Sequence, residues 1–172
     1  MPTFGYEVTE SASTPIANRF FGRPASSNSS GTGDSITALI NWNVTEKVKC
    51  ALYDQSDDSL VAETDQRETG GGKVWATFNF TTSPTISNNK TYYLTVWSDS
   101  NVNLYYKSET FHYIYRSLNY GSWPDPHGCS DYDTANFCVY CTYTEDTSES
   151  TSFQGSGRLA FGEGNSGRLV VN

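Results

Sequence analysis

Residues 91–98 have the sequence TYYLTVWS, and this stretch decides the fold class. It combines aromatic and β-branched residues, which favour a β-strand over a helix. Successive side chains of a strand point to opposite faces, so Tyr92, Leu94 and Val96 share one face and Trp97 lies on the other. The same period of two recurs earlier in the chain, at 35–42, 47–53 and 73–80.

This alternation predicts an all-β fold, an antiparallel β-sandwich of the jelly-roll type. About eight or nine strands are expected, with turn-forming residues about every 8–12 positions. No segment shows a sustained helical period, so helix should be close to absent. The residues expected to be buried are Ile36, Ile40, Val48, Leu52, Phe78, Leu94 and Val96.

The sandwich is predicted to span residues 34–144, with an extended arm at each end. Residues 1–33 are rich in Ser, Thr, Asn and Gly, and only Arg19–Gly22 suggests a short strand there. Residues 145–172 form the C-terminal arm and contain a repeat, SGRLAF at 156–161 and SGRLVV at 166–171. Each unit alternates as a short strand would, so the arm is expected to contain two strands.

Composition and charge exclude several classes of partner. The chain has 172 residues and a formal net charge of −8, which repels phosphate backbones and disfavours nucleic-acid binding. No run of 18 apolar residues is present, so no membrane-spanning segment is expected. The first ten residues have no basic start and no apolar stretch, so a signal peptide is not predicted. A virion or extracellular surface location accommodates these features.

Several segments resemble a known group of modules: KVKCALYD at 47–54, SLVAET at 59–64, WATFNF at 75–80, TYYLTVWS at 91–98, VNLYY at 102–106 and YCTY at 140–143. The chain resembles jelly-roll or immunoglobulin-like β-sandwich modules of phage and archaeal virion or surface proteins, which also occur in large secreted microbial proteins. The resemblance covers roughly residues 1–144 and implies a sandwich without established catalytic residues. Cys129, Cys138 and the 145–172 arm depart from the family pattern.

Neither a catalytic constellation nor a cofactor site is predicted. The chain has two histidines, and it contains neither a Gly-x-Ser-x-Gly elbow nor a His–Glu metalloprotease motif. The loop at 123–133 holds Asp125, Asp131 and Asp133, whose oxygens could ligate Ca²⁺. Their spacing matches no EF-hand, and the preferred interpretation is a Pro-rich connection whose aspartates cap turns. We therefore expect a protein that is not an enzyme and binds no cofactor.

The four cysteines suggest one disulfide and two buried thiols. Cys138-x-x-Cys141 resembles a zinc or redox pair, but residues three apart on a strand point to opposite faces. Cys129 lies in a loop nine residues before Cys138, so a Cys129–Cys138 disulfide would close a short loop. Cys50 and Cys141 are expected to be thiols in the core.

Aromatic residues opposite the predicted core face are the candidate ligand-binding residues. Trp75, Tyr93 and Trp97 lie on that face, together with Tyr105 or Tyr106, of which Tyr106 is preferred. Aromatic rings on a sheet face can stack on sugar rings. Alternatively, aromatics on both faces of a sheet indicate that both faces are covered, by an arm or by a neighbouring subunit.

Two functions follow from these features. The first is a non-enzymatic structural protein of a virion or similar surface assembly, such as a capsid decoration or tail-associated protein. Its partners would be copies of itself and other structural proteins. Its expected assembly residues are Arg158, Leu159, Phe161, Arg168, Leu169 and Val171. The alternative is a carbohydrate-binding module of a secreted or cell-surface protein, with surface glycans as partners.

Overall fold

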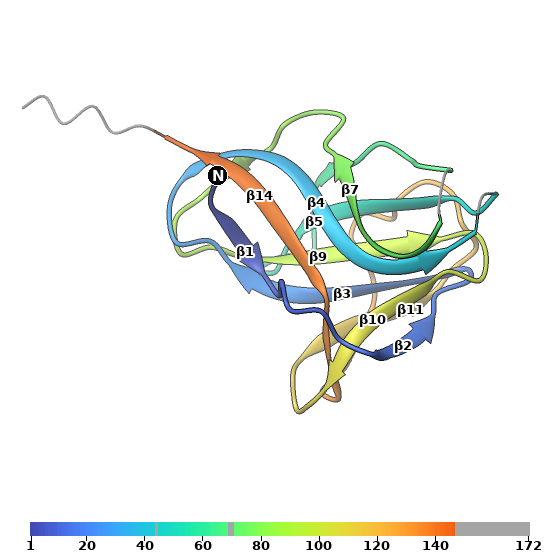
Figure 1. The fold of residues 1–172 in the computed structure, drawn as a ribbon. Coiled ribbons are helices and arrows are strands. Elements are labelled where there is room, and N and C mark those ends of the chain that lie inside the picture. The colour runs from blue at the N-terminus through green and yellow to red at the C-terminus, as the bar shows by residue number, and fades with distance from the viewer. Residues whose placement is uncertain (44, 69–70, 147–172) are drawn as a thin grey trace, which may run out of the picture.

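The computed structural model describes residues 1–43, 45–68 and 71–146, and within these ranges every regular element is a β-strand. The strands form two antiparallel sheets packed as a sandwich (Figure 1). The predicted all-β antiparallel sandwich is therefore confirmed. The C-terminal repeat at 156–171, with its expected assembly residues, lies outside the described residues.

The six-stranded sheet, called sheet B, has the order β12-β11-β3-β9-β5-β6. Its strands are β12 (Ser130–Tyr132), β11 (Tyr113–Ser117), β3 (Arg19–Ser26), β9 (Thr91–Ser98), β5 (Val48–Asp54) and β6 (Leu60–Glu63). The deciding segment TYYLTVWS is β9, and it pairs along its whole length with β3 on one side and β5 on the other. Its near-continuous burial means that both faces of the sheet are covered at this strand.

The eight-stranded sheet, called sheet A, is organised around the long strand β4 (Gly31–Trp42). β14 (Val139–Glu145) and β10 (Asn103–Ser108) follow one another along one side of β4. β7 (Gly72–Asn79) and β8 (Thr85–Ile86) pair with β4 on the other side. Three short strands complete the sheet: β1 (Thr3–Gly5) pairs with β14, and β2 (Ala12–Pro15) and β13 (Ala135–Phe137) pair with β10.

The core between the sheets contains the residues that the alternation predicted. All seven residues expected to be buried are fully buried in one hydrophobic cluster. Cys50 and Cys141 are members of the same cluster, so their prediction as core thiols is confirmed. Val74 alternates in phase with the buried residues of β7 but is 41% exposed. It lies near the end of an edge strand, which has a neighbouring strand on one side only.

The N-terminal residues are part of the sandwich, which corrects the expectation of an arm at 1–33. They supply β1, β2, all of β3 and the start of β4. β3 runs to Ser26 rather than ending at Gly22, and it lies between β9 and β11 in the middle of sheet B. Gly22 is required there, because a Cβ atom would lie 2.7 Å from Thr95 Cγ2 and 2.8 Å from Ile114 Cγ1. A glycine that weakens the strand pattern in the sequence thus permits close packing in the fold.

Candidate functional site

Two of the aromatic residues predicted to bind ligand are buried beneath the chain itself. Trp97 is fully buried and Tyr93 is 5% exposed, so the prediction of a sugar-stacking surface there is wrong. They belong to a cluster on the outer face of sheet B, against which Trp123, Tyr120 and Leu118 pack from the β11–β12 connection. Residues 118–129, called the covering loop, therefore provide the cover that the aromatics on this face require.

The covering loop is fastened to sheet B by polar contacts. Tyr53 Oη donates to the Pro124 carbonyl at 2.7 Å, and the Leu60 amide donates to Asp125 Oδ1 at 2.9 Å. The Lys49 ammonium donates to the Gly121 carbonyl and lies 4.9–5.1 Å from the ring centroids of Trp97, Tyr120 and Trp123. Burial lowers the pKa of Lys49, and the three rings supply part of the stabilisation that water would give its charge.

His127 anchors the far end of the same loop. Its backbone amide donates to the Asp58 carbonyl at 3.1 Å, and its Nδ1 accepts from the Cys129 amide at 3.0 Å. Its Nε2 lies 2.9 Å from Asp58 Oδ1, without the alignment of a hydrogen bond. Burial lowers the pKa of His127, although the nearby Asp58 carboxylate acts in the opposite direction.

The lowered pKa of His127 predicts that the protein loses stability in mild acid. The unfolded chain binds a proton at a pH of about 6.5, whereas the folded chain binds it only at lower pH. The stabilisation is therefore complete above about pH 6.5 and is lost as pH falls through the folded pKa. Thermal melts of His127→Gln should show a weaker decline in melting temperature over this range than the wild type. His112→Gln is the control, and equal declines in the wild type and His127→Gln would contradict the assignment.

The predicted Cys129–Cys138 disulfide is absent from the structure. All four cysteines lie in the described residues, and all four are free thiols. Cys129 packs on the outer face of sheet B, whereas Cys138 belongs to a cluster on the outer face of sheet A. The two sheets of a sandwich are about 10 Å apart, and a disulfide needs Cα atoms within about 7 Å. Proximity in the chain did not produce proximity in space, because β12 and β13 lead the chain from one sheet to the other.

In the described part of the chain, the thiols and the aspartates are not arranged as a metal centre. Burial raises the pKa of the Cys129 thiol to about 12, so it remains protonated and a poor nucleophile. Asp131 and Asp133 both face His112, at 3.3 and 3.4 Å, while Asp125 caps the Leu60 amide. Among the residues described, no group of three or more His, Cys, Asp or Glu side chains is arranged to hold a metal ion.

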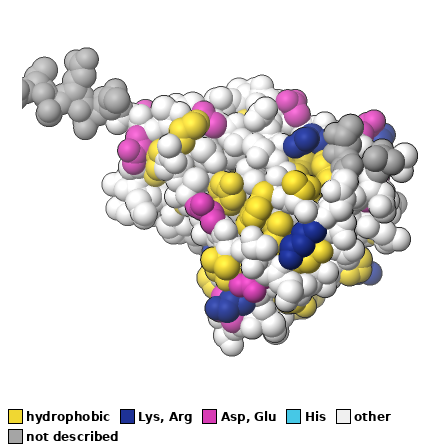
Figure 2. All heavy atoms as spheres, in the orientation of Figure 1, with side chains coloured by type: hydrophobic (Ala, Val, Ile, Leu, Met, Phe, Trp, Pro, Cys, Tyr) yellow, Lys and Arg dark blue, Asp and Glu magenta, His cyan; other side chains and the backbone are white. Residues whose placement is uncertain are grey.

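Trp75 and Tyr106 remain accessible, but the structure places them in different surroundings. Trp75 is half-buried on the outer face of sheet A, where its ring lies 5.5 Å from that of Tyr140. Its Nε1 donates to Thr9 Oγ1 at 3.2 Å, so the N-terminal segment lies over part of this face. Figure 2 shows the hydrophobic side chains of this side as separate patches with charged side chains between them. Tyr106 instead lines a cleft.

An aromatic cleft opens where one side of sheet A faces one side of sheet B. Two adjoining cavities of about 250 and about 270 Å³ form it and share Thr14, Phe21 and Tyr113. β2, β10 and β13 line it from sheet A, and β3, β11 and β12 line it from sheet B. The lining residues, which define the aromatic cleft from here on, are Thr14, Arg19, Phe21, Tyr106, Ser108, Tyr113, Tyr115, Tyr132, Thr134, Ala135 and Phe137.

The rings of the cleft are held in place by one another. Phe137 is 2% exposed and lies 5.1–5.6 Å from the rings of Phe21, Tyr106 and Tyr113. Tyr132 is 43% exposed and stacks on Tyr113, with ring centroids 5.3 Å apart and an interplanar angle of 21°. The outer rings are thus half-accessible while the inner rings are fixed in the core, which gives the cleft a rigid aromatic wall.

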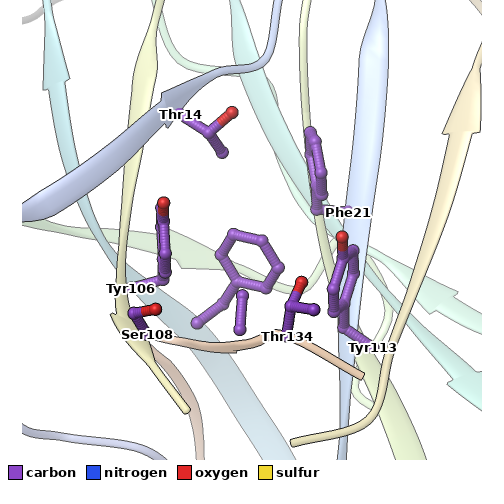
Figure 3. A pocket seen from close by; sticks show the side chains of 8 residues that line it. Thr14, Phe21, Tyr106, Ser108, Tyr113 and Thr134 are labelled. Carbon is purple, nitrogen blue, oxygen red and sulfur yellow. The ribbon is translucent and has the colours of Figure 1, made fainter. Parts of the chain in front are cut away.

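Hydroxyl groups surround these rings. Figure 3 shows Tyr106 and Tyr113 on either side of the opening, with Thr14, Ser108 and Thr134 around them. Within the described part of the chain, the hydroxyls of Tyr106 and Tyr113 have no protein hydrogen-bond partner, so both are available to a ligand. Among the described lining residues, Arg19 is the single charged side chain.

The sequence pattern does not predict most of the residues that line the cleft, although two of them share a recognisable spacing. Tyr113 and Tyr115 alternate in a strand and therefore share a face, which a search for paired exposed aromatics would find. Tyr132 is a single aromatic in a polar loop sequence, and Phe21 lies in a segment that the sequence predicted as an arm. Their meeting depends on strands far apart in the chain.

No protein-family model matches the chain, and a search of curated proteins finds no match. The resemblance to virion and surface modules therefore stays an expectation. In the described ranges, no helix is long and apolar enough to cross a membrane.

Proposed function

We propose that this chain is a non-catalytic binding domain that holds a glycan in the aromatic cleft. The observation that carries the proposal is the stacked Tyr113–Tyr132 pair at the mouth of a cleft lined by hydroxyl groups. Sugars present C–H groups on their ring faces and hydroxyls around their edges. A ligand of this kind would stack on the tyrosine rings and exchange hydrogen bonds with the lining hydroxyls.

The chemistry of the lining favours binding over reaction. Among the described lining residues there is no Asp, Glu, His or Cys, so the cleft provides neither a pair of carboxylates for glycoside hydrolysis nor an activated nucleophile. The aromatic wall is preformed, because Phe21 and Phe137 are anchored in the core. A preformed site avoids part of the entropy cost of ordering side chains on binding.

Replacing the exposed ring of the pair tests this function. A glycan array first identifies a ligand, and calorimetry then measures its affinity. We expect Tyr132→Ala to weaken binding by about tenfold or more, as for loss of a central aromatic contact. Its melting temperature should change little, because Tyr132 is 43% exposed.

Tyr140→Ala is the matched control, since Tyr140 is a half-buried tyrosine on the outer face of sheet A. Its glycan affinity should equal that of the wild type. An array on which the protein binds no glycan would contradict the proposal. Equal affinities of Tyr132→Ala and the wild type would contradict it as well.

A second candidate function is a structural protein of a virion or similar surface assembly, joined to copies of itself and to other structural proteins. The observation that favours it is an edge strand, β7, with part of its backbone left unpaired in the described chain. Molecular mass in solution separates the two functions. A stable oligomer supports assembly, whereas a monomer that binds a glycan supports the binding domain alone.

A further inference from the structure

β7 is the longest strand in the described residues that has a neighbouring strand on one side only. β7 pairs only with β4. The odd-numbered residues of β4 direct their backbone groups to the β14 side, as the hydrogen bond from Leu39 N–H to the Cys138 carbonyl shows. The even-numbered residues of β4 therefore form the backbone hydrogen bonds to β7, and their partners in β7 are also even-numbered. The odd-numbered residues of β7 consequently direct their N–H and C=O groups outward.

Part of this outer side is already capped. The Asn79 carbonyl accepts from the Asp65 amide at 2.9 Å, and the Thr77 carbonyl accepts from Arg67 Nη1 at 2.8 Å. In the described chain, no backbone partner is present on the outer side at Lys73 or Trp75. Open N–H and C=O groups on an edge strand are a template for another strand. The exposed Val74 lies between them and adds an apolar contact.

We propose that this open edge of β7 receives the C-terminal segment of a second copy of the chain as an added strand. The proposal does not depend on glycan binding. The repeat at 156–161 and 166–171 carries the matching pattern, because leucine and arginine are adjacent and therefore point to opposite faces.

Side-chain chemistry suits this pairing on both faces of the added strand. When Leu159 and Phe161, or Leu169 and Val171, lie on the face of Val74, they cover its exposed surface. The neighbouring arginine, Arg158 or Arg168, then lies on the face of Trp75. Its guanidinium can form a cation–π interaction with the half-buried indole ring. Backbone bonds would supply affinity, and these alternate contacts would set the register.

For the unit at 156–161, chain length favours a second copy over the same copy. β14 ends at Glu145, opposite Gly31, whereas the open part of β7 lies opposite residues 39–41 of β4. These positions are about 30 Å apart along β4, and β14 and β7 flank opposite sides of that strand. The ten residues 146–155 span at most about 35 Å when fully extended. The unit at 156–161 would therefore reach its own β7 only with these ten residues almost fully extended across sheet A, a restriction that a neighbouring copy does not impose. The unit at 166–171 begins ten residues later and is free of this restriction, so for that unit the melting-temperature comparison below separates the two arrangements.

Light scattering of the full-length chain and two variants at position 73 tests the proposal. Lys73→Pro removes an outward N–H and leaves the bonds to β4 intact, because proline is tolerated on an edge strand. Lys73→Ala removes the same side chain, with its contacts to the Glu10 carbonyl and the Tyr105 ring, but keeps the N–H. We expect the wild type and Lys73→Ala to oligomerise. In Lys73→Pro and in a chain lacking residues 155–172, the dissociation constant should rise by about tenfold or more.

A further variant keeps the test valid if Lys73→Pro does not fold. Val74→Lys keeps every backbone group and places a charge on the open edge, so it should also weaken association. Circular dichroism confirms that each variant is folded. A monomeric wild type overturns the proposal, and so does an oligomer that survives in both Lys73→Pro and Val74→Lys. Truncation that lowers the melting temperature of a monomer would show that the segment packs on its own domain, which also overturns it.

Discussion

A chain that lacks residues 1–26 is expected not to fold. These residues contain β3, which pairs with β9 over eight residues and with β11 over four. Its removal would separate β12 and β11 from β9, β5 and β6 and leave buried backbone groups unpaired. Phe20 and Phe21 would be lost from the clusters on the two faces of sheet B. Each loss of a buried phenylalanine costs about 3–5 kcal/mol, and a whole domain is stable by only about 5–15 kcal/mol.

Circular dichroism and the dispersion of an amide NMR spectrum measure this outcome. The control is a chain that lacks residues 1–10, which loses β1 but keeps β2 and β3. We expect that chain to fold with a lower melting temperature, because β1 has three residues and lies at the edge of sheet A. A native, dispersed spectrum from the chain lacking 1–26 would show that β3 is dispensable and that the N-terminus is an arm.

Replacing Trp97 with alanine is expected to lower the free energy of unfolding by about 3–5 kcal/mol, as for a fully buried large aromatic residue. The indole is fully buried, and its ring lies 5.0 Å from that of Trp123 and 5.7 Å from that of Phe20. The variant would leave a cavity beneath the covering loop and remove one of the three rings around the Lys49 ammonium.

Urea unfolding monitored by circular dichroism measures the change. Trp75→Ala is the matched control, because Trp75 is the half-buried tryptophan of the opposite outer face. Its loss should cost about 1–2 kcal/mol, since much of its surface already contacts water. A surface tryptophan at position 97, as the strand pattern alone predicted, would give similar small changes for both variants. Equal effects would therefore refute the burial of Trp97.

The alternation of apolar and polar residues is sufficient to predict a strand and its buried side chains where one face of the strand lies in the core. The alternation in 35–42, 47–53, 73–80 and 91–98 predicted both the strands and their buried residues, and Cys50 and Cys141 followed from the same periodicity. The pattern failed at β3, because Gly22 and Pro24 interrupt it and because both neighbouring phenylalanines are buried. A strand with both faces covered has no polar side to alternate with its apolar one.

The aromatic cleft is the part of the site that pattern could not reveal. The strand pattern predicts that Tyr106 is a surface aromatic, but its partners come from β3, β11, β12 and β13. In the same way, Tyr93 and Trp97 were predicted to be exposed, because a strand pattern states which side chains share a face and not what covers that face. Here the covering loop lies on it.

Local sequence patterns are enough to predict the all-β class, the position of most strands in 34–144 and the inner face of each, because side-chain direction in a strand depends only on neighbouring positions. Three features are visible only in the folded chain: residues 1–33 complete both sheets, Cys129 and Cys138 lie on opposite outer faces, and rings from several strands meet in one cleft. Those outcomes depend on which strands pair across long separations. Long-range pairing is set by the packing of the whole chain rather than by any local sequence pattern.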